Sequence, residues 1–154
     1  MTGTRATVQL RRGALDLDVD LELRAEVLAL VGPNGSGKSS LLHAITGALR
    51  PAKGCIELSG RLVFDSATKI DLPPARRGVG YVPQGYGLFP HLSVLNNVAF
   101  GLEATRGGDH LQAAMAQLRA LECAHLAERT PRSLSGGERQ RVALARALAI
   151  DPSL

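Results

Sequence analysis

The fold is decided by the stretch Gly32-Pro33-Asn34-Gly35-Ser36-Gly37-Lys38-Ser39, which satisfies the phosphate-loop pattern G-x-x-x-x-G-K-[ST] in full. It follows the apolar run Val27–Val31 and precedes Ser40–Ile45, so we expect it between a buried strand and the start of a helix. Glycines in such a loop let successive backbone N–H groups point at phosphate oxygens, and the helix start adds its positive end. The stretch therefore predicts a nucleotide-binding loop.

Two side chains of this loop have specific expected tasks. Lys38 is expected to reach the β- and γ-phosphates, and the Ser39 hydroxyl to ligate the Mg²⁺ that bridges them. An ordinary glycine turn is the alternative, but an accidental match is expected only about a few times per thousand chains of this composition. The predicted nucleotide-binding residues of this region are Gly32, Pro33, Asn34, Gly35, Ser36, Gly37, Lys38, Ser39 and Ser40.

Length and composition are those of an ordinary globular domain. The 154 residues suffice for one sizeable core, and 45 % of them are hydrophobic. No apolar stretch approaches the roughly 18 residues of a membrane span, and Met1–Arg5 lacks the apolar core of a secretory signal. We expect a cytoplasmic protein with Cys55 and Cys123 as free thiols. The net charge of +4 comes from scattered arginines without a basic stripe, which argues against direct nucleic-acid binding.

The order of expected elements is that of an α/β protein. Residues 6–23 alternate apolar and polar side chains, which predicts antiparallel strand structure with one wet face. We expect a helix from the phosphate loop to about Leu49, two short strands within 54–64, and a short buried strand at Val79–Val82. Further helices are expected over 94–102, 110–122 and 136–149, with Ser93, Asp109 and Ser135 as N-caps.

A second motif begins the last of these helices, at Leu134-Ser135-Gly136-Gly137-Glu138. Two glycines, a serine cap and a helix start again make an anion-binding nest. Because the phosphate loop already holds its own nucleotide, this second nest is most simply explained if it serves a nucleotide on another subunit. A plain capped helix after a glycine turn is the alternative.

The phosphate loop, Pro83-Gln84 and Leu134–Glu138, in this order and spacing, closely resemble the ATP-binding subunit of ABC transporters. The resemblance covers the whole chain. It implies an α/β fold, that of a P-loop NTPase of the ABC ATPase type, with an N-terminal antiparallel β subdomain and a helical subdomain. It divides the chain into an ATP-binding core with the phosphate loop and the Q-loop (1–92), a helical subdomain (93–133), and the signature motif with its following helix (134–154).

The resemblance also assigns roles and partners. Gln84 would contact Mg²⁺ and the attacking water and relay the nucleotide state to a transmembrane partner; a polar residue at a strand end is the alternative. Ser135 and Gly137, with Gly136 and Glu138 beside them, would contact the γ-phosphate of ATP on the opposite subunit of a head-to-tail dimer. The implied cofactors are ATP and Mg²⁺. The implied location is the inner face of the cell membrane, through permease subunits.

The segment after Gln84 narrows the subclass. Residues 87–102, with Phe89-Pro90-His91 and the following Asn97-Val98, are similar to the importer form, and Leu72–Arg77 is similar to molybdate, sulfate, ferric-iron and polyamine ATPases. The implied function is to power an importer of an inorganic ion such as molybdate. The substrate itself is read by other subunits. A non-transport ABC ATPase of DNA repair or translation is an alternative.

Two departures from the family pattern stand out. The family stacks an upstream aromatic on adenine, but this chain has none before Phe64, so a contact from the Leu10–Leu15 region would have to replace it. The family also continues with an apolar strand that ends in Asp-Glu, whereas this sequence stops at Leu154. Leu62–Asp65 imitates that strand but precedes Gln84. We therefore expect an incomplete core sheet and negligible hydrolysis by residues 1–154 alone, which leaves a nucleotide-binding fragment without catalytic activity as a further alternative.

Overall fold

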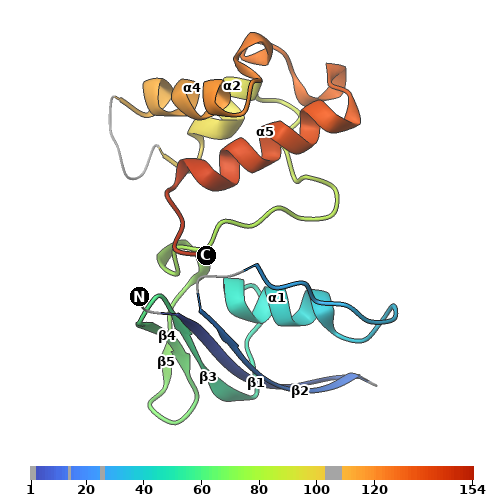
Figure 1. Ribbon diagram of the computed structural model, residues 1–154, viewed down its shortest axis with the longest axis vertical. Coiled ribbons are helices and arrows are strands. Elements are labelled where there is room, and N and C mark those ends of the chain that lie inside the picture. The colour runs from blue at the N-terminus through green and yellow to red at the C-terminus, as the bar shows by residue number, and fades with distance from the viewer. Residues whose placement is uncertain (1–2, 14, 25–26, 103–108) are drawn as a thin grey trace. The chain divides into compact units, whose positions relative to one another are not determined.

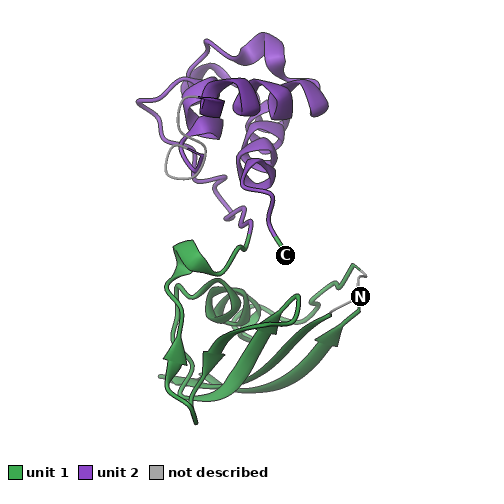
Figure 2. Cartoon of the chain, turned by 90° about the vertical axis from the view of Figure 1, so that its left-hand side faces the viewer, with its two compact units in different colours: residues 1–79, 153–154 green, residues 80–152 purple. Residues whose placement is uncertain are grey.

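The computed structural model describes residues 3–13, 15–24, 27–102 and 109–154. The chain divides into two compact units, one of residues 1–79 with 153–154 and one of residues 80–152 (Figure 2). Each unit has its own hydrophobic core. We call them the sheet unit and the helical unit.

The sheet unit is built on five antiparallel strands in the order β2-β1-β3-β4-β5 (Figure 1). The strands are β1 (Thr4–Arg12), β2 (Leu15–Leu23), β3 (Lys53–Leu58), β4 (Arg61–Asp65) and β5 (Ile70–Asp71). The strand structure expected from the alternation over 6–23 is confirmed as the β1–β2 pair, and the two short strands expected within 54–64 are β3 and β4.

The alternation along β1 and β2 separates a core face from a polar face. Ala6, Val8 and Leu10 point into the core and are at most 5 % exposed. On the other face Thr7 donates a hydrogen bond to Asp20 and Gln9 donates one to Asp18, each across the strand pair at 3.1 Å. A one-residue slip would bury these polar side chains, so the pattern sets the register.

Helix α1 (Lys38–Thr46) packs on the core face of this sheet. Leu41, Ala44 and Ile45 join the inward residues of β1, β3 and β4 in one cluster. The helix ends at Gly47, which adopts the left-handed conformation with φ 83°, and not near Leu49 as expected from the sequence. A glycine in this conformation is a common helix terminator, and it takes effect here before Pro51 is reached.

A buried arginine holds the far end of α1. Arg77 follows the short 3₁₀ helix η1 (Pro74–Arg76) and is 2 % exposed. Its guanidinium donates to the backbone oxygens of Ala44 (2.8 Å) and Ile45 (3.1 Å) in the last turn of α1. It also donates to the Leu72 oxygen and forms an ion pair with Asp71 at 3.0 Å. A cation at a helix C-terminus stabilises the helix dipole.

Two strands that the sequence predicts are not formed. Val27–Val31 has no strand assignment, and Val27 and Val31 are 100 % and 91 % exposed. Val79–Val82 is likewise irregular, with Val82 37 % exposed. An apolar run becomes a buried strand only when a neighbouring strand takes its hydrogen bonds, and no such neighbour exists among the described residues.

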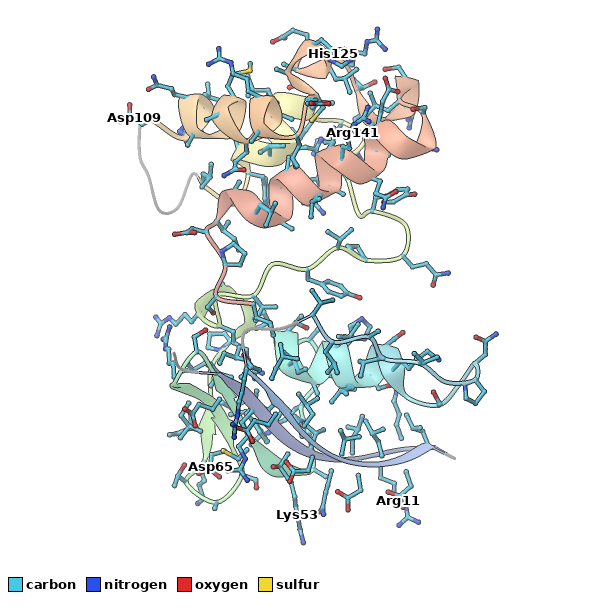
Figure 3. All side chains as sticks on the ribbon, in the orientation of Figure 1. Arg11, Lys53, Asp65, Asp109, His125 and Arg141 are labelled. Atoms are coloured by element: carbon cyan, nitrogen blue, oxygen red, sulfur yellow. The ribbon has the colours of Figure 1, made fainter. Side chains whose placement is uncertain are left out.

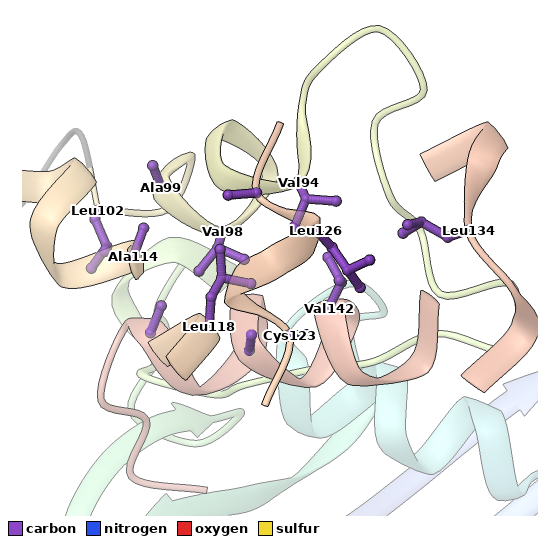
Figure 4. Close-up of a cluster of buried hydrophobic side chains, with 13 residues drawn as sticks. Val94, Val98, Ala99, Leu102, Ala114, Leu118, Cys123, Leu126, Leu134 and Val142 are labelled. Atoms are coloured by element: carbon purple, nitrogen blue, oxygen red, sulfur yellow. The ribbon is translucent and has the colours of Figure 1, made fainter. Parts of the chain in front are cut away.

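The helical unit contains α2 (Val94–Ala99), α4 (His110–Ala120), α5 (Gly136–Ala149) and the 3₁₀ helices η3 (Ala124–Leu126) and η4 (Pro131–Ser133). Its core gathers Val94 and Val98 of α2, Leu118 of α4 and Val142 of α5 around Leu126, and all five are fully buried (Figure 4). All three expected helices are present, with α2 and α4 ending earlier than the sequence pattern indicates.

Two of the three expected N-caps are confirmed. The side chain of Ser93 accepts from the Asn96 N–H, and that of Ser135 accepts from the Glu138 N–H. Asp109 stands at the expected N-cap position of α4, but its side chain makes no capping hydrogen bond there. Its backbone conformation (φ −91°, ψ 4°) is not the extended one in which a cap residue reaches the first helical turn.

The two cysteines agree with the expectation from composition. Cys55 is exposed, Cys123 is buried, and both are free. In the part of the chain that the structure describes, no helix has the length and apolar character needed to cross a membrane.

Arg77→Leu is expected to lower the free energy of unfolding by about 3 kcal/mol, because it removes the donor to the buried oxygens of Ala44 and Ile45 and leaves Asp71 with Arg50 as its ion-pair partner. Urea unfolding followed by circular dichroism measures the loss. The neighbouring Arg76→Leu is the control, since Arg76 is exposed and should cost little. Equal losses in the two variants would contradict the role of Arg77.

Candidate nucleotide-binding site

The phosphate loop leads into a helix start that no side chain caps. Gly37 is the N-cap of α1, with φ 92°, and no side-chain cap hydrogen bond is present there. The first intrahelical N–H is that of Leu41, which donates to the Gly37 oxygen at 2.9 Å. The N–H groups of Lys38, Ser39 and Ser40 precede it and have no intrahelical acceptor. This end of α1 therefore offers three donors and a positive dipole end to an anion.

Packing against β2 explains why a glycine stands at position 37. A Cβ built there would lie 3.0 Å from Leu17 Cδ1 and 3.3 Å from Leu15 Cδ1, in a backbone conformation that side chains rarely adopt. The loop consequently lies directly against the leucine face of β2. A side chain there would have to displace the ends of these leucines and adopt a left-handed backbone, so glycine is favoured.

Lys38 is folded back over the loop. Its Nζ donates to the Gly32 oxygen at 2.8 Å and the Pro33 oxygen at 2.7 Å, and it lies 3.4 Å from Ser36 Oγ. These contacts hold a positive charge beside the free N–H groups of the helix start. They also occupy the ammonium donors, so a bound phosphate has to compete with the two carbonyls for Lys38.

A cavity of about 300 Å³ adjoins the loop. Its polar wall comes from the loop and Lys38, and its apolar wall comes from β2, α1 and the segment before the loop. It is lined by Leu17, Val19, Leu30, Val31, Gly32, Pro33, Ser36, Gly37, Lys38 and Leu41. One charged wall and one apolar wall suit a ligand with both an anionic and an apolar part.

The residues at the phosphate loop suit a metal ion that binds together with phosphate better than a metal ion that is bound by protein side chains alone. Among the described residues, no group of three or more His, Cys, Asp or Glu side chains could hold a metal ion. The Ser39 side chain is exposed at the first turn of α1, where its hydroxyl oxygen can serve as one ligand.

The hairpin end expected to replace the adenine aromatic divides into buried and accessible residues. Leu10 is 5 % exposed and belongs to the core, so it cannot face a base. Leu15 is half-buried and lies next to Gly37, while Arg11 forms only an exposed 3.9 Å ion pair with Asp16 (Figure 3). Among the described residues of the Leu10–Leu15 region, Leu15 is thus the apolar residue whose side chain lies beside the phosphate loop.

The start of α5 differs from that of α1, because its own side chains cap it. Ser135 Oγ accepts from the Glu138 N–H at 3.3 Å, and Glu138 Oε2 accepts from the Ser135 N–H at 2.7 Å. This reciprocal capping box does not use the backbone N–H groups of Gly136 and Gly137. Both glycines are exposed, with open space where a Cβ would stand.

The capping box has an electrostatic consequence. The Ser135 backbone N–H and hydroxyl, with smaller contributions from Arg129 and His125, hold the pKa of Glu138 below its ordinary value of 4.5. The carboxylate is therefore ionised at neutral pH and stabilises the helix start.

Gln84 lies in the helical unit, in an exposed loop. Pro83 and Tyr86 close a turn around it, with the Tyr86 N–H donating to the Pro83 oxygen at 2.9 Å. The expected site residues thus divide between the units: Gly32–Ser40 belong to the sheet unit, and Gln84 and Ser135–Glu138 to the helical unit.

Sequence reasoning missed two residues that shape the loop after Gln84. The fully buried Asn97 accepts from the Phe89 N–H at 2.7 Å and donates to the oxygens of Phe89, Leu92 and Ser93. Arg146 of α5 donates to the Tyr86 and Gly87 oxygens. The sequence does contain a signal for such residues, namely a polar side chain within an otherwise apolar helical stretch. Arg146 within Ala143–Ala149 is an example.

A glycine-rich loop that runs into an uncapped helix start, with a lysine over it, defines the class of phosphate-loop nucleotide-binding proteins. A family model described as "ABC transporter" matches residues 16–154, and the chain belongs to that family. The fold and family that the sequence predicts are thereby confirmed.

Three similar curated proteins are all named as import ATP-binding proteins for molybdate, tungstate or molybdenum. The molybdate/tungstate import ATP-binding protein WtpC of Archaeoglobus fulgidus is 45 % identical over 150 residues, which are 97 % of this chain and 60 % of the relative. The molybdenum import ATP-binding protein ModC is 44 % identical in Paramagnetospirillum magneticum, over 94 % of this chain and 40 % of the relative. The ModC protein of Mycobacterium tuberculosis is 45 % identical to this chain, over 97 % of this chain and 42 % of the relative. The chain spans 40–60 % of these relatives.

A solved structure gives the same fold. The dimeric structure of MJ0796, a bacterial ABC transporter cassette, matches with a TM-score of 0.77 and 29 % identity, over 97 % of this chain and 70 % of that one. A second structure of MJ0796, in a post-hydrolysis state bound to ADP and Pi, matches equally well. The chain thus has the fold of part of an ABC cassette.

Lys38→Ala is expected to weaken ATP binding by about 2 kcal/mol, roughly 30-fold in the dissociation constant, because a charge-assisted contact is lost. Titration calorimetry with ATP and Mg²⁺ measures it. Lys53→Ala is the control, since Lys53 is exposed on β3 and distant in sequence from the loop. Equal affinity of wild type and Lys38→Ala would refute the phosphate-loop assignment.

Glu138→Gln should change how stability depends on pH. The folded pKa of Glu138 is lowered, so its ionised form contributes stability above pH 4.5 that is lost as the pH falls through the folded pKa. Thermal midpoints from about pH 7 to about pH 3 should show wild type losing its advantage over Glu138→Gln in this range. The exposed Glu128, changed to Gln, is the control. A constant difference between wild type and Glu138→Gln would contradict the capping role.

Proposed function

We propose that this chain binds ATP with Mg²⁺ at the phosphate loop and is part of a subunit that hydrolyses ATP to power an ABC importer. The observation that carries the proposal is the uncapped start of α1 beneath Lys38, where three N–H donors and one ammonium converge. Its support also includes the family assignment and the 44–45 % identity to import ATP-binding proteins.

In this proposal each residue has one task. The N–H groups of Lys38, Ser39 and Ser40 bind the phosphates, and Lys38 exchanges its loop carbonyls for phosphate oxygens. The Ser39 hydroxyl and the Gln84 amide oxygen would hold Mg²⁺, which when bound offsets the charge that develops on the phosphates. Gln84 would also orient the attacking water. The cavity beside the loop, with Leu15 at its edge, would receive the apolar part of the nucleotide.

The start of α5 would act on a second copy of the subunit. The capping box does not use the N–H groups of Gly136 and Gly137, and the Ser135 hydroxyl would exchange Glu138 for the ligand. We propose that they bind the γ-phosphate of ATP held by the partner, so that two nucleotides join a head-to-tail dimer. The dimeric state of the MJ0796 cassette supports this arrangement.

An oxyanion of the molybdate type is the imported substrate that we propose, since the similar proteins are named for molybdate, tungstate and molybdenum import. The substrate would be bound by other subunits. The segment 87–102 would face the permease, which would hold the subunit at the cytoplasmic face of the membrane. In this proposal the chain keeps the three predicted functional segments, which are the ATP-binding core (1–92), the helical subdomain (93–133) and the signature motif with its helix (134–154).

Residues 1–154 alone are expected to bind nucleotide and to hydrolyse it negligibly. The unpaired and exposed Val27–Val31 segment supports this second candidate function, because it leads directly into the phosphate loop without a neighbouring strand among the described residues. Phosphate release by the purified 154-residue chain tests it. Robust Mg²⁺-dependent turnover that Lys38→Ala abolishes would reject it.

Ser135→Arg in the full-length protein should spare ATP binding and abolish ATP-driven dimerisation and turnover, because a bulky cation replaces the hydroxyl at the start of α5. Gel filtration with ATP under conditions that block hydrolysis measures the dimer. Ser133→Arg in the exposed η4 is the control, since it adds the same charge outside the helix start. An undiminished dimer in Ser135→Arg would leave the motif as a plain capped helix.

A further inference from the structure

The loop that follows Gln84 is held by a side chain from α5. Arg146 Nη1 donates to the Gly87 oxygen at 2.7 Å, and Nη2 donates to the Tyr86 oxygen at 3.1 Å. The planar guanidinium thus binds two successive carbonyls of the segment 83–90, which we call the Gln84 loop. A lysine at this position could not present two parallel donors in one plane.

These two carbonyls belong to residues in an unusual conformation. Tyr86 and Gly87 both have positive φ, 63° and 61°. The left-handed region is uncommon for a bulky residue such as Tyr86, and the structure around such a residue has to keep it there. Glycine adopts this conformation without strain, so the strained residue is Tyr86. Arg146 contacts the carbonyls of both residues, two and three positions after Gln84.

The ring of Phe89 completes the contact. The Arg146 guanidinium carbon lies 5.4 Å from the centroid of the Phe89 ring, and that ring lies 4.6 Å from the ring of Phe100. Asn97 of α2 holds the backbone of Phe89 at the other side. The Gln84 loop is therefore held by α5 near Gln84 and by α2 farther along.

Arg146 makes these contacts without a counter-ion among the described residues, since none of the ion pairs found there includes it. Burial lowers the pKa of Arg146, which reflects the loss of hydration that its carbonyl and ring partners replace. A desolvated cation that binds only backbone oxygens and a ring is suited to fixing a loop in place.

Helix α5 connects this contact to the motif at its start. Ser135 and Arg146 are eleven residues apart on one continuous helix, about 16 Å at 1.5 Å per residue. The capping box at one end and the buried residues Val142 and Ala145 keep this helix as a single rigid element. A displacement at Ser135 consequently moves Arg146 with it.

We propose that Arg146 is a positioning residue that makes the Gln84 loop follow α5, so that a ligand bound at Ser135–Gly137 sets the position of the Gln84 side chain. This inference rests on the proposed function, in which Ser135 contacts a partner's nucleotide and Gln84 orients the attacking water. It adds the physical connection between the two, which runs through one guanidinium and two carbonyls.

The test uses the full-length protein with Arg146→Gln, which removes the charge, and Arg146→Lys, which keeps the charge but not the planar pair of donors. Arg141→Gln is the matched control, because Arg141 is an exposed arginine of the same helix (Figure 3). We expect kcat for ATP to fall roughly tenfold or more in Arg146→Gln, with KM and ATP affinity within about twofold of wild type. Arg146→Lys should be intermediate, and Arg141→Gln should be unchanged.

Two further measurements separate positioning from general damage. In a Gln84→Ala background, Arg146→Gln should lower kcat no further, because the residue acts through Gln84. Hydrogen exchange should speed up at the amides of 85–89 in Arg146→Gln while those of α5 keep their protection. If Arg146→Gln does not fold, the same kcat and hydrogen-exchange measurements are made on Arg146→Lys.

The outcomes separate the inference from the function on which it rests. A wild type that neither binds nor hydrolyses ATP contradicts the proposed function, and hydrogen exchange then still decides whether Arg146 holds the loop. A wild-type kcat in Arg146→Gln, or losses that add to those of Gln84→Ala, would overturn the inference. A non-additive loss together with faster exchange confined to 85–89 would support it.

Discussion

The attachment of α1 to the sheet is the constraint on which the sheet unit depends. At its first turn, Gly37 brings the backbone close to the side chains of Leu15 and Leu17 of β2, and its left-handed conformation (φ 92°) favours glycine there. At its last turn, Arg77 donates to the Ala44 and Ile45 oxygens and leaves no room for a Cβ at Gly47, where one would lie 2.6 Å from Arg77 Nε. With both ends fixed, the direction of the helix is set, and the donors at its start have a defined place relative to β2.

The two helix starts of the expected site illustrate how similar sequence motifs acquire different chemistry. Both combine glycine and serine ahead of an amphipathic helix. In α1 no side chain caps the first turn, so its donors remain for a ligand. In α5 a glutamate three residues after Ser135 completes a capping box, and the helix start is stable without a ligand. An uncapped helix N-terminus is less stable unless an anion binds there. Of the two helices, α1 is therefore the one whose stability is expected to increase when phosphate binds.

Local patterns in the sequence predicted the elements that depend on local contacts. The alternation over 6–23, the two short strands within 54–64 and the serine N-caps Ser93 and Ser135 depend on residues close in sequence, and each formed as expected. Val27–Val31 and Val79–Val82 did not, because a buried strand requires a neighbour that the sequence pattern does not specify. Arg77, Asn97 and Arg146 were missed for a related reason. Each binds backbone oxygens; a polar residue in an apolar stretch can be noticed in the sequence, but the oxygens that it binds cannot be read from it.

The predicted site residues belong to two units, and each of the two loops takes its shape within its own unit. The phosphate loop takes its shape from β2 and α1, within one unit, and the Gln84 loop takes its shape from α2 and α5, within the other. Because each unit has its own core, neither loop needs the other unit to be correctly folded. The start of α1 therefore presents its donors from within the sheet unit, and Asn97 and Arg146 hold the Gln84 loop from within the helical unit.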